Sequence, residues 1–326
     1  MEFGNLATIK PEVLPSLLPN LFWFVISCLV LIVAGIYLVK ALSKIARFLG
    51  ISEFSAAFII MAFASSIPEL FVGLSSAFAG TPALSLGNII GANIIDLTLI
   101  SGIIIILSKE IKINSRKVGK DIYFMLGSIL LMIVLYVIGN SLSRIDGFIL
   151  LVVFLFHTYN VFNKRKKYPK KIKKESGMEF WWLLIFILAL IGLFISSNFV
   201  VKFGSNLAID LGLPEIMLGL FIISIATTLP ELVFGISASG LKHKEMAVGD
   251  QVGAVVIHST LIIGIVAIIS PITTEFMPFI ISSIFMFISA FIFVTFLKTG
   301  QKLEKIEGVS LILIYVLFVM IEFFAK

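Results

Sequence analysis

The stretch FASSIPELFVG, from Phe63 to Gly73, places a proline and a glutamate side by side in a long apolar segment. A similar stretch, SIATTLPELVFG, occupies Ser224 to Gly235, 162 residues further along the chain. The same offset, without a gap, pairs Pro68 with Pro230, Glu69 with Glu231, Gly87 with Gly249, Gly91 with Gly253, and Gly102 with Gly264. Chance does not produce so many matches in one register, so the sequence predicts an internal repeat.

The composition indicates a membrane protein. Of 326 residues, 59% are hydrophobic and only 13% are charged, and the mean hydropathy is +1.13. Soluble proteins carry about 25% charged residues. Apolar runs of about 20 residues recur along the chain, each long enough to cross the bilayer core as a helix. We therefore predict an all-α polytopic membrane protein whose surroundings are the lipid bilayer.

The apolar runs divide into ten predicted transmembrane helices. They are 19–41, 52–79, 83–107, 119–139, 145–162, 180–202, 213–239, 246–270, 275–297 and 307–325. Five spans in each half mean that the second half enters the membrane from the opposite side. The sequence thus predicts two inverted five-helix repeats, 1–163 and 179–326, joined by a basic cytoplasmic linker at 164–178. Inverted repeats are typical of secondary transporters.

The positive charges predict the orientation. Of the 25 lysines and arginines, 21 follow odd-numbered spans. Because positive residues concentrate on the cytoplasmic side, both termini are predicted to be extracytoplasmic, in a protein of the plasma membrane. The run KRKKYPKKIKK, from Lys164 to Lys174, is a solvated linker or a contact for lipid headgroups. Charge confined to such loops does not indicate a nucleic-acid partner, and no obligatory protein partner is evident.

The two Pro–Glu pairs are costly in a membrane unless they bind something. Proline frees a backbone carbonyl, and a free carbonyl in hydrocarbon must line a cavity or bind a ligand. No lysine or arginine lies at the depth of Glu69 or Glu231 to neutralise it. Each pair is preceded by two hydroxyl residues: Ser65 and Ser66, and Thr227 and Thr228. A cation bound by these oxygens accounts for all of them, and such oxygens suit Ca²⁺. The alternative is a packing kink with a protonated, hydrogen-bonded glutamate.

Two partner segments carry further polar residues. They are LGNIIGANIID, from Leu86 to Asp96, and VGDQVGAVVIH, from Val248 to His258. Asp96 and His258 are repeat mates, and we expect both to face the same cavity as the glutamates. An intramembrane carboxylate is a mark of an ion pathway, whereas His258 is either functional or a packing residue. Asp250 is expected nearer the cytoplasmic end of its span and ranks below Asp96.

The motifs SSIPE and TTLPE resemble the signatures of the two α-repeats of the Ca²⁺/cation antiporter superfamily. The nearest resemblance is to prokaryotic sodium/calcium exchangers, with Gly-Thr-Ser-x-Pro-Glu followed by Gly-Asn-x-x-Gly-Ser-Asn. It implies alternating access, in which the first and sixth helices slide against a core bundle that holds the cation sites. The implied ligands are Glu69, Glu231, Ser65, Ser66, Thr227, Thr228, Asp96, His258 and the carbonyls of Ala62 and Ser224.

This sequence departs from that pattern at the partner segments. Ala92 and Ala254 stand where the family has serines of its flanking Na⁺ sites. Asp96 replaces an asparagine, and His258 replaces an aspartate. The resemblance with these departures predicts an antiporter that exchanges Ca²⁺ for Na⁺ or H⁺, with no cofactor beyond the transported ions.

Other functions are left open by the same residues. One alternative is a proton-coupled antiporter for Ca²⁺ or another divalent cation, with Asp96 and His258 as proton sites. A cation channel is less favoured, because channels usually place identical subunits around an axis along the membrane normal. An enzyme is not expected, since no HExxH pair, nucleophile motif or nucleotide-binding loop is present.

Overall fold

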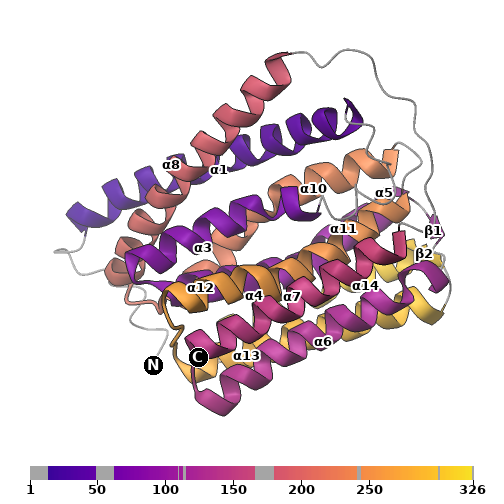
Figure 1. Ribbon diagram of the computed structural model, residues 1–326. Helices are drawn as coiled ribbons and strands as arrows, with labels where there is room; N and C mark the ends of the chain where they lie inside the picture. The colour runs from indigo at the N-terminus through magenta and orange to yellow at the C-terminus, as the bar shows by residue number, and fades with distance from the viewer. Residues whose placement is uncertain are drawn as a thin grey trace.

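The computed structural model describes residues 14–48, 62–108, 110–112, 115–165, 180–240, 244–299 and 302–324. It is a bundle of helices with one two-stranded sheet (Figure 1). Most of the predicted linker at 164–178 and the beginning of the predicted span 52–79 lie outside these residues.

The elements of the first half alternate between long helices and short breaks. They are α1 (Leu14–Phe48), α3 (Ile67–Ala79), α4 (Pro82–Ile95), the π-helical turn η2 (Asp96–Ile100), α5 (Ser101–Ser108), β1 (Glu110–Lys112), α6 (Ser115–Gly139) and α7 (Arg144–Arg165). Those of the second half are α8 (Phe180–Leu211), α9 (Glu215–Leu218), η3 (Gly219–Ile223), α10 (Ser224–Gly240), α11 (Lys244–Val256), η4 (Ile257–Ile262), α12 (Ile263–Ile269), α13 (Phe276–Thr299), β2 (Lys302–Glu304) and α14 (Lys305–Phe324).

Eight helical segments of the described chain are long and apolar enough to cross a membrane, and they coincide with eight of the ten predicted spans. The other two predicted spans differ in detail. Span 52–79 is represented by α3, an apolar helix of 13 residues, with residues 52–61 outside the described chain. Span 307–325 corresponds to α14, which is 20 residues long and carries Glu307 and Glu322.

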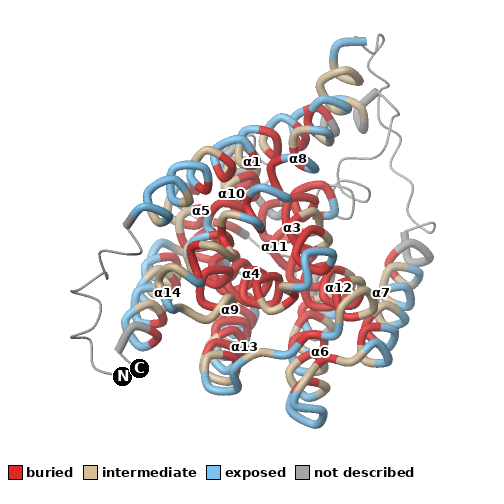
Figure 2. Tube along the Cα trace, turned by 90° about the vertical axis from the view of Figure 1, so that its left-hand side faces the viewer, coloured by how far each residue is buried: buried red, intermediate tan, exposed pale blue. Residues whose placement is uncertain are grey.

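Helices α1 and α8 form a layer of their own against the bundle (Figure 1). Leu31 and Leu38 of α1 and Leu193 of α8 belong to a hydrophobic cluster that is separate from the larger core of α4, α6, α11 and α13. The outward faces of both helices are apolar, as expected against lipid. Figure 2 shows burial concentrated in α4, α10, α11 and α12, with exposure on the surrounding helices.

Strand pairing repeats with the offset found in the sequence. In the antiparallel pair β1·β2, Glu110 lies opposite Glu304. A separate antiparallel bridge joins Leu142 to Ile272. Adding 162 to 110 gives 272, and adding 162 to 142 gives 304, so these two contacts join corresponding pairs of positions. The internal repeat of the sequence is therefore also present in the pairing of distant segments.

Close helix crossings repeat in the same way. Gly102 of α5 packs on Gly308 of α14, and a Cβ on Gly102 would lie 2.6 Å from the Gly308 carbonyl oxygen. Its repeat mate Gly264, in α12, packs on Gly147 of α7, where the corresponding distance is 3.0 Å. Both crossings bring backbones into direct contact, which only small residues permit.

A third crossing positions the centre of the bundle. A Cβ on Gly87 of α4 would overlap the carbonyl oxygen of Ile216, and one on Gly219 would overlap that of Leu84. The first half therefore touches the second half, backbone to backbone, where α4 crosses α9 and η3. This contact brings the polar residues of α4 close to the Pro–Glu segment of α10.

Candidate cation site

The two Pro–Glu segments adopt different backbones. The first is helical from Ala62 to Ser65, turns at Ser66, and begins α3 at Ile67 with Pro68 in the first turn. Glu69 is therefore in the first turn of a helix, where backbone N–H groups are unpaired and negative charge is favoured. In the second segment the helix is not interrupted, because Pro230 lies inside α10, and the irregular turn is η3, before the signature.

Helix α1 lies directly over both prolines. A Cβ on Gly35 would be 2.7 Å from Cγ of Pro230 and 3.2 Å from Cγ of Pro68. The two signature segments therefore meet the α1/α8 layer at a single glycine. A bulkier residue there would collide with at least one of the rigid rings.

The hydroxyl residues pair with the carbonyls predicted to bind a cation. Ser66 Oγ donates to Ala62 O at 2.7 Å, Ser65 Oγ to Ala62 O at 3.3 Å, Thr228 Oγ1 to Ser224 O at 2.8 Å, and Thr227 Oγ1 to Ser224 O at 3.2 Å. Hydroxyl and carbonyl oxygens each have two lone pairs. These oxygens remain possible ligands while they satisfy one another.

Four buried carboxylates gather at the centre of the bundle: Glu69, Asp96, Glu231 and Asp250, each 0–1% exposed. None of their oxygens has a hydrogen-bond partner among the described residues. They are close enough for the charges of Glu69, Asp96 and Asp250 to act on Glu231. Within the described ranges, no lysine or arginine forms an ion pair with them. Uncompensated buried charge is strongly unfavourable, so the cluster favours cations.

Asp250 is close to the other buried carboxylates. It is 1% exposed on α11, and its charge acts on both Asp96 and Glu231. It lies near the start of the candidate span Ala247–Ile269, and its rank below Asp96 stays a prediction. Asp250 is the repeat mate of Asn88, a polar residue of the other partner segment.

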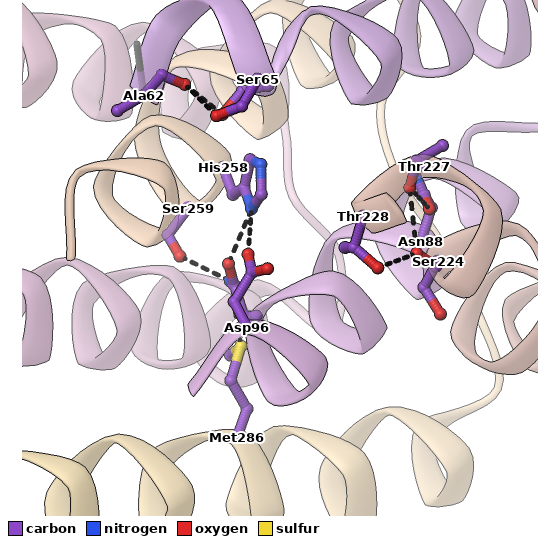
Figure 3. Close-up of polar contacts among 12 residues, drawn as sticks. Ala62, Ser65, Asn88, Asp96, Ser224, Thr227, Thr228, His258, Ser259 and Met286 are labelled. Atoms are coloured by element: carbon purple, nitrogen blue, oxygen red, sulfur yellow. Dashed lines mark hydrogen bonds and ion pairs between the residues drawn. The ribbon is translucent and has the colours of Figure 1, made fainter. Parts of the chain in front are cut away.

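His258 is fixed by a chain of hydrogen bonds from three elements (Figure 3). Its Nδ1 lies 3.0 Å from Oδ1 of Asn93 and 3.8 Å from Oδ2 of Asp96. The Asn93 amide nitrogen donates to Ser259 Oγ at 3.1 Å and to Met286 Sδ at 3.3 Å. Because the amide nitrogen is committed to these acceptors, Asn93 Oδ1 faces the ring, and Nδ1 of a neutral imidazole carries the hydrogen. Its Nε2 then presents a lone pair.

His258 belongs to a possible metal-binding group. Nε2 of His258 has no hydrogen-bond partner in the described part of the chain. Glu69, Glu231 and His258 each offer one ligand atom, and the three atoms lie within 4.8 Å of one another. The two halves thus contribute to one group, with Glu69 from α3 and the other two from α10 and η4.

All ten residues predicted for the site are buried in the structure. Figure 3 shows Ala62, Ser65, His258 and Asp96 on one side of the view, with Ser224, Thr227 and Thr228 gathered beside Asn88 on the other. Thr227 Oγ1 donates to Asn88 Oδ1 at 3.1 Å, which joins α10 to α4.

The two partner positions share a backbone irregularity. The π-helical turn η2 begins at Asp96, and η4 includes its mate His258. Such turns are frequent at functional sites because they displace one residue from the regular helix. The structural roles of Asn88 and Asn93 were not predicted, although both are polar residues in an apolar span.

Known proteins resemble this chain over most of its length. The family model described as sodium/calcium exchanger protein matches residues 19–163 and 181–324. The sodium/calcium exchanger MaX1 of Methanosarcina acetivorans is 24% identical over 330 residues, covering 88% of this chain and 94% of its own. The inner membrane protein YrbG of Escherichia coli is 27% identical over 262 residues, covering 76% and 79%.

Two solved structures share the fold. The crystal structure of the H⁺/Ca²⁺ exchanger CAX has a TM-score of 0.76 at 17% identity, covering 98% of this chain and 88% of its own. A structure of the sodium-calcium exchanger NCX_Mj has a TM-score of 0.65 at 22% identity, covering 92% and 97%.

Proposed function

The chain belongs to the sodium/calcium exchanger protein family, and we propose that it is a secondary-active antiporter that exchanges Ca²⁺ for Na⁺ or H⁺. Its family places it among integral membrane transporters, and its relative MaX1 is named as an exchanger, not an enzyme. The observation that carries the proposal is the central group of four buried carboxylates. No lysine or arginine of the described chain forms an ion pair with this group.

The charge of this group supports exchange. Four ionised carboxylates carry four negative charges, and one divalent cation neutralises half of them. The remaining negative charge needs protons or monovalent cations, because unpaired charge in a low-dielectric interior is costly. When the divalent ion leaves, the same carboxylates need a replacement before the site can reorient. If the site reorients only with an ion bound, the transport of one ion is coupled to the transport of the other.

We assign the central ligands to Glu69 and Glu231, one from each half. The hydroxyls of Ser65, Ser66, Thr227 and Thr228, the carbonyls of Ala62 and Ser224, and the partner residues Asp96 and His258 complete the proposed set. Burial of all ten residues and the proximity of Glu69, Glu231 and His258 support this assignment.

The proposal includes ten spans as two inverted repeats, 1–163 and 179–326, with a cytoplasmic linker at 164–178. Both termini are extracytoplasmic, and the membrane is the plasma membrane. The contacts repeated at an offset of 162 residues support the repeats. The position of α1 and α8 as a layer of their own (Figure 1), with Gly35 over both prolines, supports sliding of this layer over the site. Such sliding would open the site to one side at a time.

A proton is the counter-ion favoured by the partner residues. Ala92 and Ala254 supply no hydroxyl for Na⁺, and the imidazole of His258 lies 3.8 Å from the Asp96 carboxylate. In this version of the proposal, Asp96 and His258 hold the proton. Na⁺ and H⁺ coupling are distinguished by the gradient that drives uptake.

The test is ⁴⁵Ca²⁺ uptake into proteoliposomes with an imposed Na⁺ gradient or an imposed pH gradient. We expect one gradient to drive Ca²⁺ accumulation against its own gradient. Rapid downhill Ca²⁺ movement that neither gradient drives would replace the antiporter with a channel. Glu322→Gln is the matched control, since Glu322 is a buried glutamate of α14, outside the proposed ligand set.

A further inference from the structure

His258 gives the central site one nitrogen among oxygens. Its side chain is fully buried, and Nε2 has no partner among the described residues. Its ligand atom lies within 4.8 Å of those of Glu69 and Glu231. Every other residue of the proposed ligand set offers oxygen.

Nitrogen and oxygen ligands select different cations. Ca²⁺ is a hard cation that takes six to eight oxygens, so an imidazole in its cage deprives it of an oxygen ligand. Zn²⁺ binds histidine nitrogen at about 2.0–2.1 Å and carboxylate oxygen at similar distances. Imidazole and carboxylate together suit first-row divalent metals such as Mn²⁺ and Zn²⁺ better than Ca²⁺.

The spacing of the three ligand atoms fits such an ion. Ligands of a tetrahedral Zn²⁺ at about 2.1 Å lie roughly 3.4 Å apart, by simple geometry from those bond lengths. The three ligand atoms lie within 4.8 Å of one another, so an ion between them would draw them closer. The two glutamates come from opposite halves, so the ion would join both halves.

The imidazole is already oriented as a metal ligand. Metal-bound histidines usually donate the other ring N–H to a carbonyl or carboxylate, which fixes the ring and its tautomer. Here Nδ1 faces Oδ1 of Asn93 at 3.0 Å, and Asn93 is itself held by Ser259 and by Met286 of α13. The lone pair on Nε2 is thereby left for an ion.

We propose that the central site takes a first-row divalent transition metal, with Mn²⁺ and Zn²⁺ as representatives, in preference to Ca²⁺. Nε2 of His258 and the carboxylates of Glu69 and Glu231 bind the ion, and Asn93 is the positioning residue for the ring. The inference rests on the proposed function, because it specifies the cargo of the same site.

The first test compares cargo ions in proteoliposomes. Uptake of ⁴⁵Ca²⁺ is measured with increasing unlabelled Mn²⁺, Zn²⁺ or Ca²⁺ under the gradient that drives transport. We expect Mn²⁺ and Zn²⁺ to compete at concentrations at least about tenfold below Ca²⁺. His258→Asp, which restores an oxygen, should shift this ratio at least about tenfold toward Ca²⁺. Stronger competition by Ca²⁺, or an unchanged ratio in His258→Asp, overturns the inference.

Two variants distinguish the positioning of the His258 ring by Asn93 from a general effect on folding. Asn93→Ala should shift the ratio in the same direction as His258→Asp, by a smaller factor, because the ring loses its anchor. His157→Ala should leave it unchanged, since His157 of α7 stacks on Phe124 and is not in the site. Equal shifts in Asn93→Ala and His157→Ala would indicate a general loss of structure and contradict the positioning role.

A binding measurement tests the metal site independently of transport. Mn²⁺ is added to the purified full-length protein, and electron spin-echo spectroscopy detects any nitrogen bound to the ion. We expect a ¹⁴N coupling in the wild type that disappears in His258→Asp. Bound Mn²⁺ without this coupling, or no bound Mn²⁺, overturns the inference. If no divalent ion is transported but the coupling is present, the antiport proposal fails and the metal site stands.

Discussion

The two copies of the signature match at some positions and differ at others. Glu69 and Glu231 are identical, and each follows two hydroxyl residues that donate to the carbonyl one turn earlier. Their partner segments are unlike, with Asp96 opposite His258 in the repeat. In the proposed site, the matched positions supply charge and oxygen from both halves, and we expect the unlike positions to adjust which ion is held. Breaking a matched position should therefore stop exchange, and changing an unlike one should alter selectivity.

The largest effect should come from removing a matched carboxylate. Glu69→Gln and Glu231→Gln should each lower exchange by about 100-fold or more, since losing one partner of a buried charge group costs about 3–5 kcal/mol. Flux of ⁴⁵Ca²⁺ in proteoliposomes measures it, with Glu322→Gln as the control. Wild-type flux in either variant would refute a site shared by the two halves.

Removing an unlike carboxylate should have a smaller effect. Asp250→Asn makes that position match Asn88, and it should weaken divalent-ion binding by about tenfold, because one nearby charge is lost at an intermediate dielectric. Calorimetric titration of Ca²⁺ and Mn²⁺ into the purified protein measures the change. An affinity equal to that of the wild type would remove Asp250 from the electrostatics of the site.

The matched hydroxyls provide the next comparison. Ser66→Ala and Thr228→Val each remove one donor to a backbone carbonyl, with hydrogen bonds of 2.7 and 2.8 Å. A neutral hydrogen bond contributes about 1 kcal/mol, so each variant should lose about fivefold in apparent divalent-ion affinity. The dependence of uptake on the concentration of the divalent ion gives the apparent affinity of each variant. A large loss in one variant and none in the other would show that the hydroxyls of the two copies are not equivalent.

The smallest effect should appear in stability. A Cβ at Gly102 would lie 2.6 Å from a backbone oxygen, whereas at its mate Gly264 the distance is 3.0 Å. Gly102→Ala should cost about 1–3 kcal/mol through overpacking, and Gly264→Ala should cost less. Thermal unfolding in detergent ranks the two. A lower unfolding temperature for Gly264→Ala than for Gly102→Ala would contradict the packing argument.

Much of this arrangement could be predicted from the sequence, because the two halves of the sequence are visibly similar. Pro68 and Pro230 mark the two signatures, and a glutamate in an apolar span needs a partner wherever the helix lies. The apolar runs have the length of a membrane span, which is why eight predicted spans coincide with long apolar helices. These features depend on local composition and on comparison of the chain with itself.

Features that depend on packing between distant helices were not predicted. The orientation of His258 requires Asn93 and also Met286 of α13, which belongs to no motif. The burial of Asp250 and its proximity to Asp96 and Glu231 depend on how α11 packs in the bundle. The break at Ser66, in contrast to the continuous α10, has no counterpart in the two similar sequences. Such differences arise from tertiary contacts.

The central claim is that one cation joins Glu69 to Glu231. Anomalous diffraction from crystals of the full chain grown with Mn²⁺ would locate the ion directly. The account predicts a peak within about 2.0–2.6 Å of a carboxylate oxygen of each glutamate, the range of metal–oxygen bonds in proteins. A peak bound to only one of the two glutamates, or Mn²⁺ found only at the protein surface, would contradict it.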